Sequence, residues 1–84
     1  MKDIEIVFSR HAAGRMRLYG IEEADVVATI RAGSVVPDFA SGKAALVNED
    51  LSEKYGYPLK VVFSREGDTI VVITTYPMKR RRRP

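Results

Sequence analysis

The chain of 84 residues contains no cysteine, and His11 is its only histidine. Without cysteine it can form neither disulfides nor metal sites built on thiolates. A single histidine also leaves too few nitrogen ligands for a zinc site made by the protein alone. We therefore expect no metal and no cofactor. A core of this size is small, but it can form without disulfides.

Long apolar runs are also missing. No stretch approaches the length of a membrane-spanning helix, and the charged start Met1-Lys2-Asp3 differs from a signal peptide. The sequence has no phosphate-binding glycine loop, no metal-binding motif and no nucleophile elbow. These absences predict a cytoplasmic protein that does not contact a membrane.

Positive charge gathers at one end of the chain. The formal net charge is +3, but five consecutive cations at Lys79–Arg83 account for it, so the residues before them are net acidic. A basic tail indicates contact with a polyanion. The alternative is an end that keeps the protein in solution or binds a protein partner.

The first part of the chain predicts a strand followed by two helices. Residues 4–8 are rich in β-branched and aromatic residues, as strands are. Ser9 is a suitable N-cap for a helix that runs to Tyr19, and Gly20 can end that helix in the left-handed conformation. A second helix begins at Glu22 with acidic residues in its first turn. Because almost nothing joins the two helices, we expect them to pack as a hairpin.

Strands follow the helices. Residues 49–56 are polar and predict a loop. The order of elements indicates an α+β domain at residues 1–77, with an N-terminal strand, a helical hairpin and then a four-stranded antiparallel sheet. Residues 78–84 form a basic tail that we expect to be disordered in isolation. The β-branched segments that predict the four strands are residues 34–38, 43–48, 59–63 and 69–76.

The turn between the last two strands decides which side chains share a face of the sheet. We expect Gly67 to take the left-handed position of a three-residue loop, residues 65–67. Lys60, Thr74 and Tyr76 then lie together on the face away from the helices. A loop one residue longer would break this grouping, because a one-residue slip reverses the faces. The predicted core face carries Leu59, Val61, Phe63, Val71, Ile73 and Thr75, and the other face also carries Val62, Ile70 and Val72.

The first helix places polar side chains among apolar ones. At about 100° per residue, His11 and Arg15 fall within the arc that also carries Ala12, Met16 and Tyr19. An imidazole can move a proton near neutral pH, and a guanidinium can hold a phosphate. The pair therefore suits phosphate chemistry. The alternative is structural: a histidine that caps the helix or binds a carbonyl, and an arginine that lies over apolar residues.

Two further groups of side chains are candidates. Lys60, Thr74 and Tyr76 combine a lysine, a hydroxyl and a phenol that could line a site, or they could simply form an exposed sheet face. Tyr55 and Tyr57 flank a glycine, where they could stack on bases or cover an edge of the core.

The residues around His11 resemble a known family signature. The signature F-S-x-H-A-x-x-R-M, from a family of small bacterial domains of unknown function, is matched by Phe8-Ser9-Arg10-His11-Ala12 and Arg15-Met16, with Gly20-Ile21 after them. The family's closing half is similar to Gly56–Val62 and Val72–Tyr76, so the resemblance covers nearly all of the chain before the tail. That family resembles the RelE/ParE-like toxins and the BrnT-type toxins. The resemblance implies a helical hairpin followed by a curved antiparallel sheet.

The same resemblance implies an activity, which is RNA cleavage without a metal. We expect an endoribonuclease reaction in which a ribose 2′-hydroxyl attacks the adjacent phosphate. His11 and Arg15 occupy the family's signature positions. His11 would transfer the proton, while Arg15 and Arg10 would bind phosphate.

The family's C-terminal positions correspond to Lys60, Thr74 and Tyr76. Lys60 or Tyr76 would assist the transition state, and Thr74 would contact the substrate. The expected partners are RNA and an antitoxin protein. The alternative is a non-catalytic module of the same fold that binds a protein or a nucleic acid.

Overall fold

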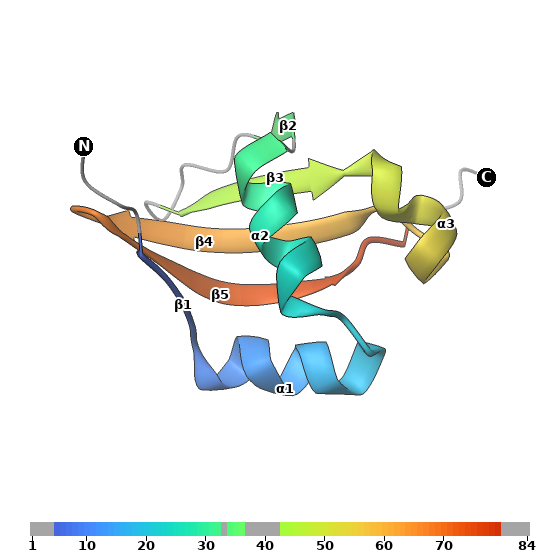
Figure 1. The fold of residues 1–84 in the computed structure, drawn as a ribbon, viewed down its shortest axis with the longest axis horizontal. Helices are drawn as coiled ribbons and strands as arrows, with labels where there is room; N and C mark the ends of the chain where they lie inside the picture. The colour runs from blue at the N-terminus through green and yellow to red at the C-terminus, as the bar shows by residue number, and fades with distance from the viewer. Residues whose placement is uncertain (1–4, 33, 37–42, 80–84) are drawn as a thin grey trace.

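The β-branched segments from both ends of the chain join in one sheet (Figure 1). A computed structural model describes residues 5–32, 34–36 and 43–79. Within these residues the strand order is β1-β5-β4-β3-β2. The elements are β1 (Glu5–Phe8), α1 (Arg10–Tyr19), α2 (Glu23–Ala32), β2 (Ser34–Val36), β3 (Ala44–Asn48), η1 (Glu49–Leu51), α3 (Ser52–Tyr55), β4 (Leu59–Glu66) and β5 (Thr69–Pro77).

The α+β class is confirmed, but the sheet is mixed rather than antiparallel. Strands β2 to β5 pair antiparallel in chain order. The N-terminal strand β1 joins them by pairing with β5 in parallel, with Glu5 opposite Thr69 and Phe8 opposite Val72. Without β1, the outer backbone groups of β5 would form an unpaired edge. The N-terminal strand therefore completes the sheet.

The predicted ends of α1 are confirmed. The Ser9 hydroxyl accepts a hydrogen bond from the Ala12 N–H at 3.0 Å and donates to the Ile73 carbonyl at 2.9 Å. One side chain thus caps the helix and fixes its first turn to β5. At the other end, Gly20 has φ +67° and its N–H bonds the Met16 carbonyl.

The expectation of a helical hairpin is wrong, because each helix packs on the sheet. α1 contacts β5, whereas α2 contacts β3 and β4, and the two helices run in different directions (Figure 1). Ala12 and Met16 bury the inner side of α1, and Val26 and Ile30 pack into the same core from α2. Apolar stripes that each face the sheet stabilise the domain more than a helix–helix contact would.

The polar segment after β3 is helical, not a loop. It forms η1 and α3, and the Asn48 side chain caps the first turn by accepting the Asp50 N–H at 2.9 Å. Leu51 and Tyr55 pack against the core from these turns. Because the segment is short and only two of its side chains pack against the core, its sequence shows no helical periodicity of apolar residues.

The turn between β4 and β5 is one residue shorter than expected. Glu66 pairs with Thr69, so the loop contains only Gly67, at φ +64°, and Asp68. This shorter loop reverses the predicted faces near the turn. Ile70 and Val72, expected on the outer face, are therefore buried.

A bulge then restores the expected grouping farther along the strands. Phe63 pairs with Val72 but Val62 pairs with Thr74, so one extra residue stands in β5. The bulge reverses the faces of the sheet a second time, and this cancels the reversal caused by the shorter turn. As a result Lys60 lies opposite Tyr76, and Thr74 and Tyr76 share the face of Lys60 as predicted, although the predicted turn was wrong.

Two polar side chains lie in the core, and both are hydrogen-bonded. The Thr75 hydroxyl donates to the Lys60 carbonyl at 2.8 Å. The Thr29 hydroxyl donates to the Asp25 carbonyl at 2.8 Å and accepts from the Asn48 amide at 3.2 Å. Because each hydroxyl has a hydrogen-bond partner, its burial costs little free energy. The buried apolar side chains around them are Leu59, Val61, Val26 and Val72.

The start of the basic tail continues the fold at the end of β5. The Met78 N–H donates to the Pro58 carbonyl at 2.7 Å. The four arginines at 80–83 and Pro84 lie outside the described residues, as do Gly33 and residues 37–42. In the part that is described, no helix combines the length and the apolar character needed to cross a membrane.

Candidate functional site

Three side chains line up along the exposed side of α1. His11, Arg15 and Tyr19 are spaced four residues apart, so they lie one above the other on the helix. Arg15 Nε donates to His11 Nε2 at 3.4 Å, and Arg15 Nη1 donates to the Tyr19 hydroxyl at 3.5 Å. His11 and Tyr19 are exposed, and Arg15 is half-buried. The central guanidinium thus links an imidazole to a phenol.

The contact with Arg15 shows which ring nitrogen of His11 accepts a hydrogen bond. A guanidinium can only donate, so Nε2 of His11 is the acceptor in this contact. Within the described residues, His11 bonds neither a carbonyl nor a helix end. His11 is an exposed imidazole whose Nε2 accepts from Arg15.

An open groove of about 600 Å³ lies beyond the C-terminal end of α1. Tyr19 lines it from α1, Tyr55 from α3 and Tyr76 from β5, and Tyr57 comes from the segment between α3 and β4. The chain has four tyrosines, so every one of them lines this groove. We call it the tyrosine groove. Its remaining lining residues are Pro77, Met78 and Lys79.

Lys60 is a neighbour of the tyrosine groove through Tyr76. The two residues pair across β4 and β5, and Lys60 Nζ lies 5.9 Å from the centroid of the Tyr76 ring. An ammonium at this distance is attracted to the negative face of the ring. Thr74 is half-buried on the same face, opposite Val62.

The two predicted groups are connected only through the tyrosine groove. Among the described contacts, none joins His11 or Arg15 directly to Lys60. Tyr19 links them, because it contacts Arg15 and shares the groove with Tyr76. Arg10 is exposed at the start of α1. The predicted residues thus do not form one compact cluster.

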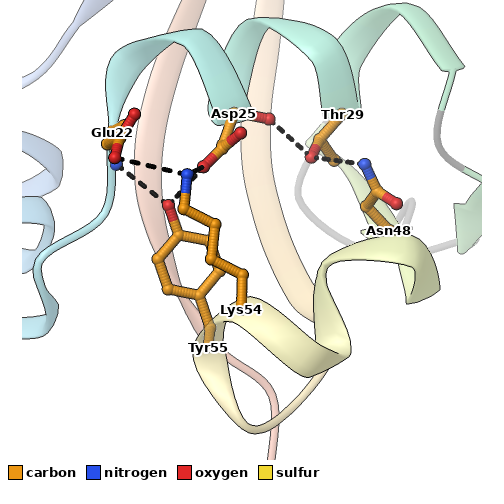
Figure 2. A network of polar contacts seen from close by, with 6 residues as sticks. All are labelled: Glu22, Asp25, Thr29, Asn48, Lys54 and Tyr55. Carbon is orange, nitrogen blue, oxygen red and sulfur yellow. Dashed lines mark hydrogen bonds and ion pairs between the residues drawn. The ribbon is translucent and has the colours of Figure 1, made fainter.

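A polar network holds Tyr55, which is one of the residues that line the tyrosine groove (Figure 2). The Tyr55 hydroxyl donates to Asp25 Oδ2 at 2.5 Å and accepts the Glu22 N–H at 3.1 Å. Lys54 Nζ lies 2.7 Å from Asp25 Oδ2 and 3.2 Å from Glu22 Oε2. The network joins the first turn of α2 to α3, so it fixes the orientation of the Tyr55 ring.

The pKa shifts in the network follow from these contacts. Hydrogen bonds from Lys54 and Tyr55 hold the pKa of the Asp25 carboxyl below its usual value of 3.8. Asp25 in turn raises the pKa of the Lys54 ammonium. Burial, helped by the bond to Asp25, raises the pKa of the Tyr55 hydroxyl. Tyr55 is therefore a fixed, neutral wall and not an acid that works near neutral pH.

Sequence reasoning missed this network and the convergence of the tyrosines. Asp25 and Tyr55 are 30 residues apart, and no local pattern joins them. Glu22 was explained by the helix dipole alone, and Tyr19 was assigned to the apolar stripe of α1. The one available signal was the tyrosine pair around Gly56, for which base stacking and cover of the core were left open. Tyr55 contributes to both the core and the groove.

In the described part of the chain, no three histidine, aspartate or glutamate side chains are grouped closely enough to hold a metal ion.

The comparison with known families gives a different kind of finding. Residues 8–77 match a domain of unknown function, DUF4258. The chain belongs to the DUF4258 family.

The DUF4258 match spans the fold from the end of β1 to the end of β5. It includes His11, Arg15, Lys60 and Tyr76, and it ends just before Met78. No curated protein and no solved structure matches the chain. The match thus confirms the expected family of small domains of unknown function.

Proposed function

We propose that this DUF4258 domain is a metal-independent endoribonuclease, related in fold and activity to the RelE/ParE-like and BrnT-like toxins. The observation that carries the proposal is the His11–Arg15 contact on the exposed side of α1. It sets a proton acceptor beside a phosphate-binding cation, on a surface that continues through Tyr19 into the tyrosine groove.

The reaction begins with the ribose 2′-hydroxyl. His11 Nε2 takes its proton as the 2′-oxygen attacks the adjacent phosphorus. Arg15 turns its guanidinium from His11 to the phosphate oxygens, which are stronger acceptors than an imidazole, and thereby leaves Nε2 free. Arg10, exposed at the start of α1, adds a second phosphate contact.

The reaction ends at the leaving group. The bond between phosphorus and the 5′-oxygen breaks, and that oxygen takes a proton from water. The products are a 2′,3′-cyclic phosphate and a 5′-hydroxyl. Lys60, Thr74 and Tyr76 share the sheet face away from α1, so they bind the strand beyond the reacting phosphate.

The test is cleavage of RNA by the purified protein in the presence of a chelator. We expect His11→Ala to lower the cleavage rate by about 10²- to 10⁴-fold, which is the usual effect of losing a general base. Arg15→Ala should lower it at least about tenfold, because each charge-assisted phosphate contact is worth more than 1 kcal/mol. Arg17→Ala is the matched control, since Arg17 is exposed on the same helix and has no contact with His11. RNA left intact by the wild type would refute the proposal.

The alternative function is a non-catalytic module that binds an antitoxin protein or a nucleic acid through the same surface. The observation in its favour is the exposed aromatic groove, which does not require His11. It predicts that expression of the chain causes no growth arrest and that a partner copurifies with it. His11→Ala would then leave partner binding unchanged, whereas a tyrosine substitution in the groove would weaken it.

A further inference from the structure

We propose that the tyrosine groove is a stacking site for unpaired bases of single-stranded RNA, and that Lys79 in its wall contacts a phosphate of the same strand. The proposal names the substrate class of the ribonuclease, and it rests on that function for the choice of RNA over DNA. Binding in the groove can nevertheless be measured without any cleavage.

The distribution of exposed aromatic rings points to a ligand with flat faces. Tyr19 is 43% exposed and Tyr57 is 41% exposed, and both line the groove. Leu18, the other large apolar side chain exposed in the described residues, lies outside it. Base stacking on aromatic rings tolerates any sequence, because every base has a π face. The volume of about 600 Å³ lies within the range of small-ligand sites.

The ring of Tyr55 is held in place before any ligand arrives, and those of Tyr19 and Tyr76 each have a cation beside them. Tyr55 is fixed by its bonds to Asp25 and to the Glu22 N–H. The hydroxyl of Tyr19 accepts from Arg15, and the ring of Tyr76 lies beneath the ammonium of Lys60. Rings that are already oriented lose little entropy on binding, so more of the stacking energy appears as affinity.

The charges beside the groove favour a polyanion as the occupant. Lys79 lines the groove, and Lys60 lies against Tyr76. The nearby acids Glu22 and Asp25 are paired with Lys54. A proline-rich peptide also binds aromatic grooves, but it needs no cations.

The tyrosines themselves supply the measurement. Because the chain has no tryptophan and its four tyrosines all line the groove, ¹⁹F NMR of protein labelled with fluorotyrosine reports on the groove alone. The probe is a 2′-O-methyl oligouridylate of about six nucleotides, a common site size for single-strand binders. It has no 2′-hydroxyl and cannot be cleaved. We expect the tyrosine resonances to shift on its addition.

Substitutions distinguish base stacking from nonspecific hydrophobic binding. Tyr57→Leu keeps an apolar side chain but removes the ring, and it should weaken probe binding by about fivefold to a hundredfold. Leu18→Ala is the control, because it changes an exposed apolar residue outside the groove and should leave affinity unchanged. Lys79→Ala should reduce the slope of log affinity against log salt by up to about one, the value for one lost phosphate contact.

Two results would overturn the proposal. The first is equal binding, with equal tyrosine shifts, by an abasic oligomer of the same length and charge, which would leave no role for the bases. The second is displacement of the oligouridylate from the groove by a proline-rich peptide of higher affinity.

The ribonuclease and the stacking site can fail separately. If the methylated probe shifts the tyrosines but natural RNA stays intact, the stacking site stands and the ribonuclease falls. If RNA is cleaved and Tyr57→Leu changes neither cleavage nor binding, the ribonuclease stands and the stacking site falls.

Discussion

Two polar clusters lie on either side of the tyrosine groove, and they are built differently. Behind Tyr55, the side chains of Asp25 and Lys54 meet at 2.7 Å, and Asp25 is only 17% exposed. Along α1, the contacts of Arg15 with His11 and Tyr19 are 3.4 and 3.5 Å long and open to water. In the first cluster, the polar groups of Asp25, Lys54 and Tyr55 are already paired with one another. The second has donors and acceptors that a ligand can compete for.

This difference separates residues that hold the fold from residues available for chemistry. A short, partly buried network contributes to stability and to the shape of the groove. Long contacts on an exposed helix contribute little to stability. We therefore expect substitutions in the network to change the free energy of unfolding, and substitutions on α1 to change activity without changing stability.

The largest expected effect on stability is that of Asp25→Ala. It removes the acceptor of both Lys54 and Tyr55 and leaves the Tyr55 hydroxyl partly buried with one partner fewer. The free energy of unfolding should fall by about 1–3 kcal/mol, measured by urea denaturation. Glu23→Ala, an exposed acid in the same helix turn, is the control. Equal stability of wild type and Asp25→Ala would remove the distinction between the clusters.

Tyr55→Phe should have a smaller effect. It keeps the ring in the groove and removes only the hydroxyl that bonds Asp25 and the Glu22 N–H. We expect a loss of about 1 kcal/mol in the urea experiment, with stacking of the oligouridylate retained. Tyr57→Phe is the matched variant and should leave stability unchanged, because Tyr57 is exposed. Equal losses for the two variants would contradict a specific role for the Tyr55 hydroxyl.

Acid should weaken the same network. The pKa of Asp25 is lower in the folded chain than its ordinary value of 3.8, so the unfolded chain binds the proton more readily. The contribution of Asp25 is therefore present above about pH 4 and is lost as the pH falls through the folded pKa. Urea midpoints measured across this range should fall less steeply with acid in Asp25→Asn than in wild type. Identical acid profiles would show that Asp25 is not the group responsible.

The smallest effect on stability is expected on α1. His11→Ala and Arg15→Ala each remove an exposed, long contact, so the free energy of unfolding should change by less than about 0.5 kcal/mol. Urea denaturation of both variants measures this directly. A loss as large as that of Asp25→Ala would make the pair structural and would contradict its proposed role.

Local signals in the sequence predicted the ends of α1 well, because capping depends on neighbours. Ser9 and Gly20 act within one helical turn, and both behave as expected. The His11–Arg15 contact could be predicted for the same reason, since residues four apart on a helix are neighbours. The turns of α3 were missed because they are too short to show a period.

Contacts between distant residues could not be predicted in this way. The outer face of Lys60 and Tyr76 was predicted correctly only because a shorter turn and an unforeseen bulge cancel. Nothing near Asp25 in the sequence indicates Lys54 as its partner, because the two meet only when α3 docks on α2. The tyrosine groove depends in the same way on the packing of α1, α3 and β5.

We propose that the exposed pair on α1 does the chemistry while the network behind Tyr55 holds the shape. The most direct test of this claim is the rate at which His11→Ala cleaves single-stranded RNA in chelator, measured beside its urea midpoint. We predict a rate lower than that of the wild type by about 10²- to 10⁴-fold, with an unchanged midpoint. Cleavage by His11→Ala at the wild-type rate would contradict the claim.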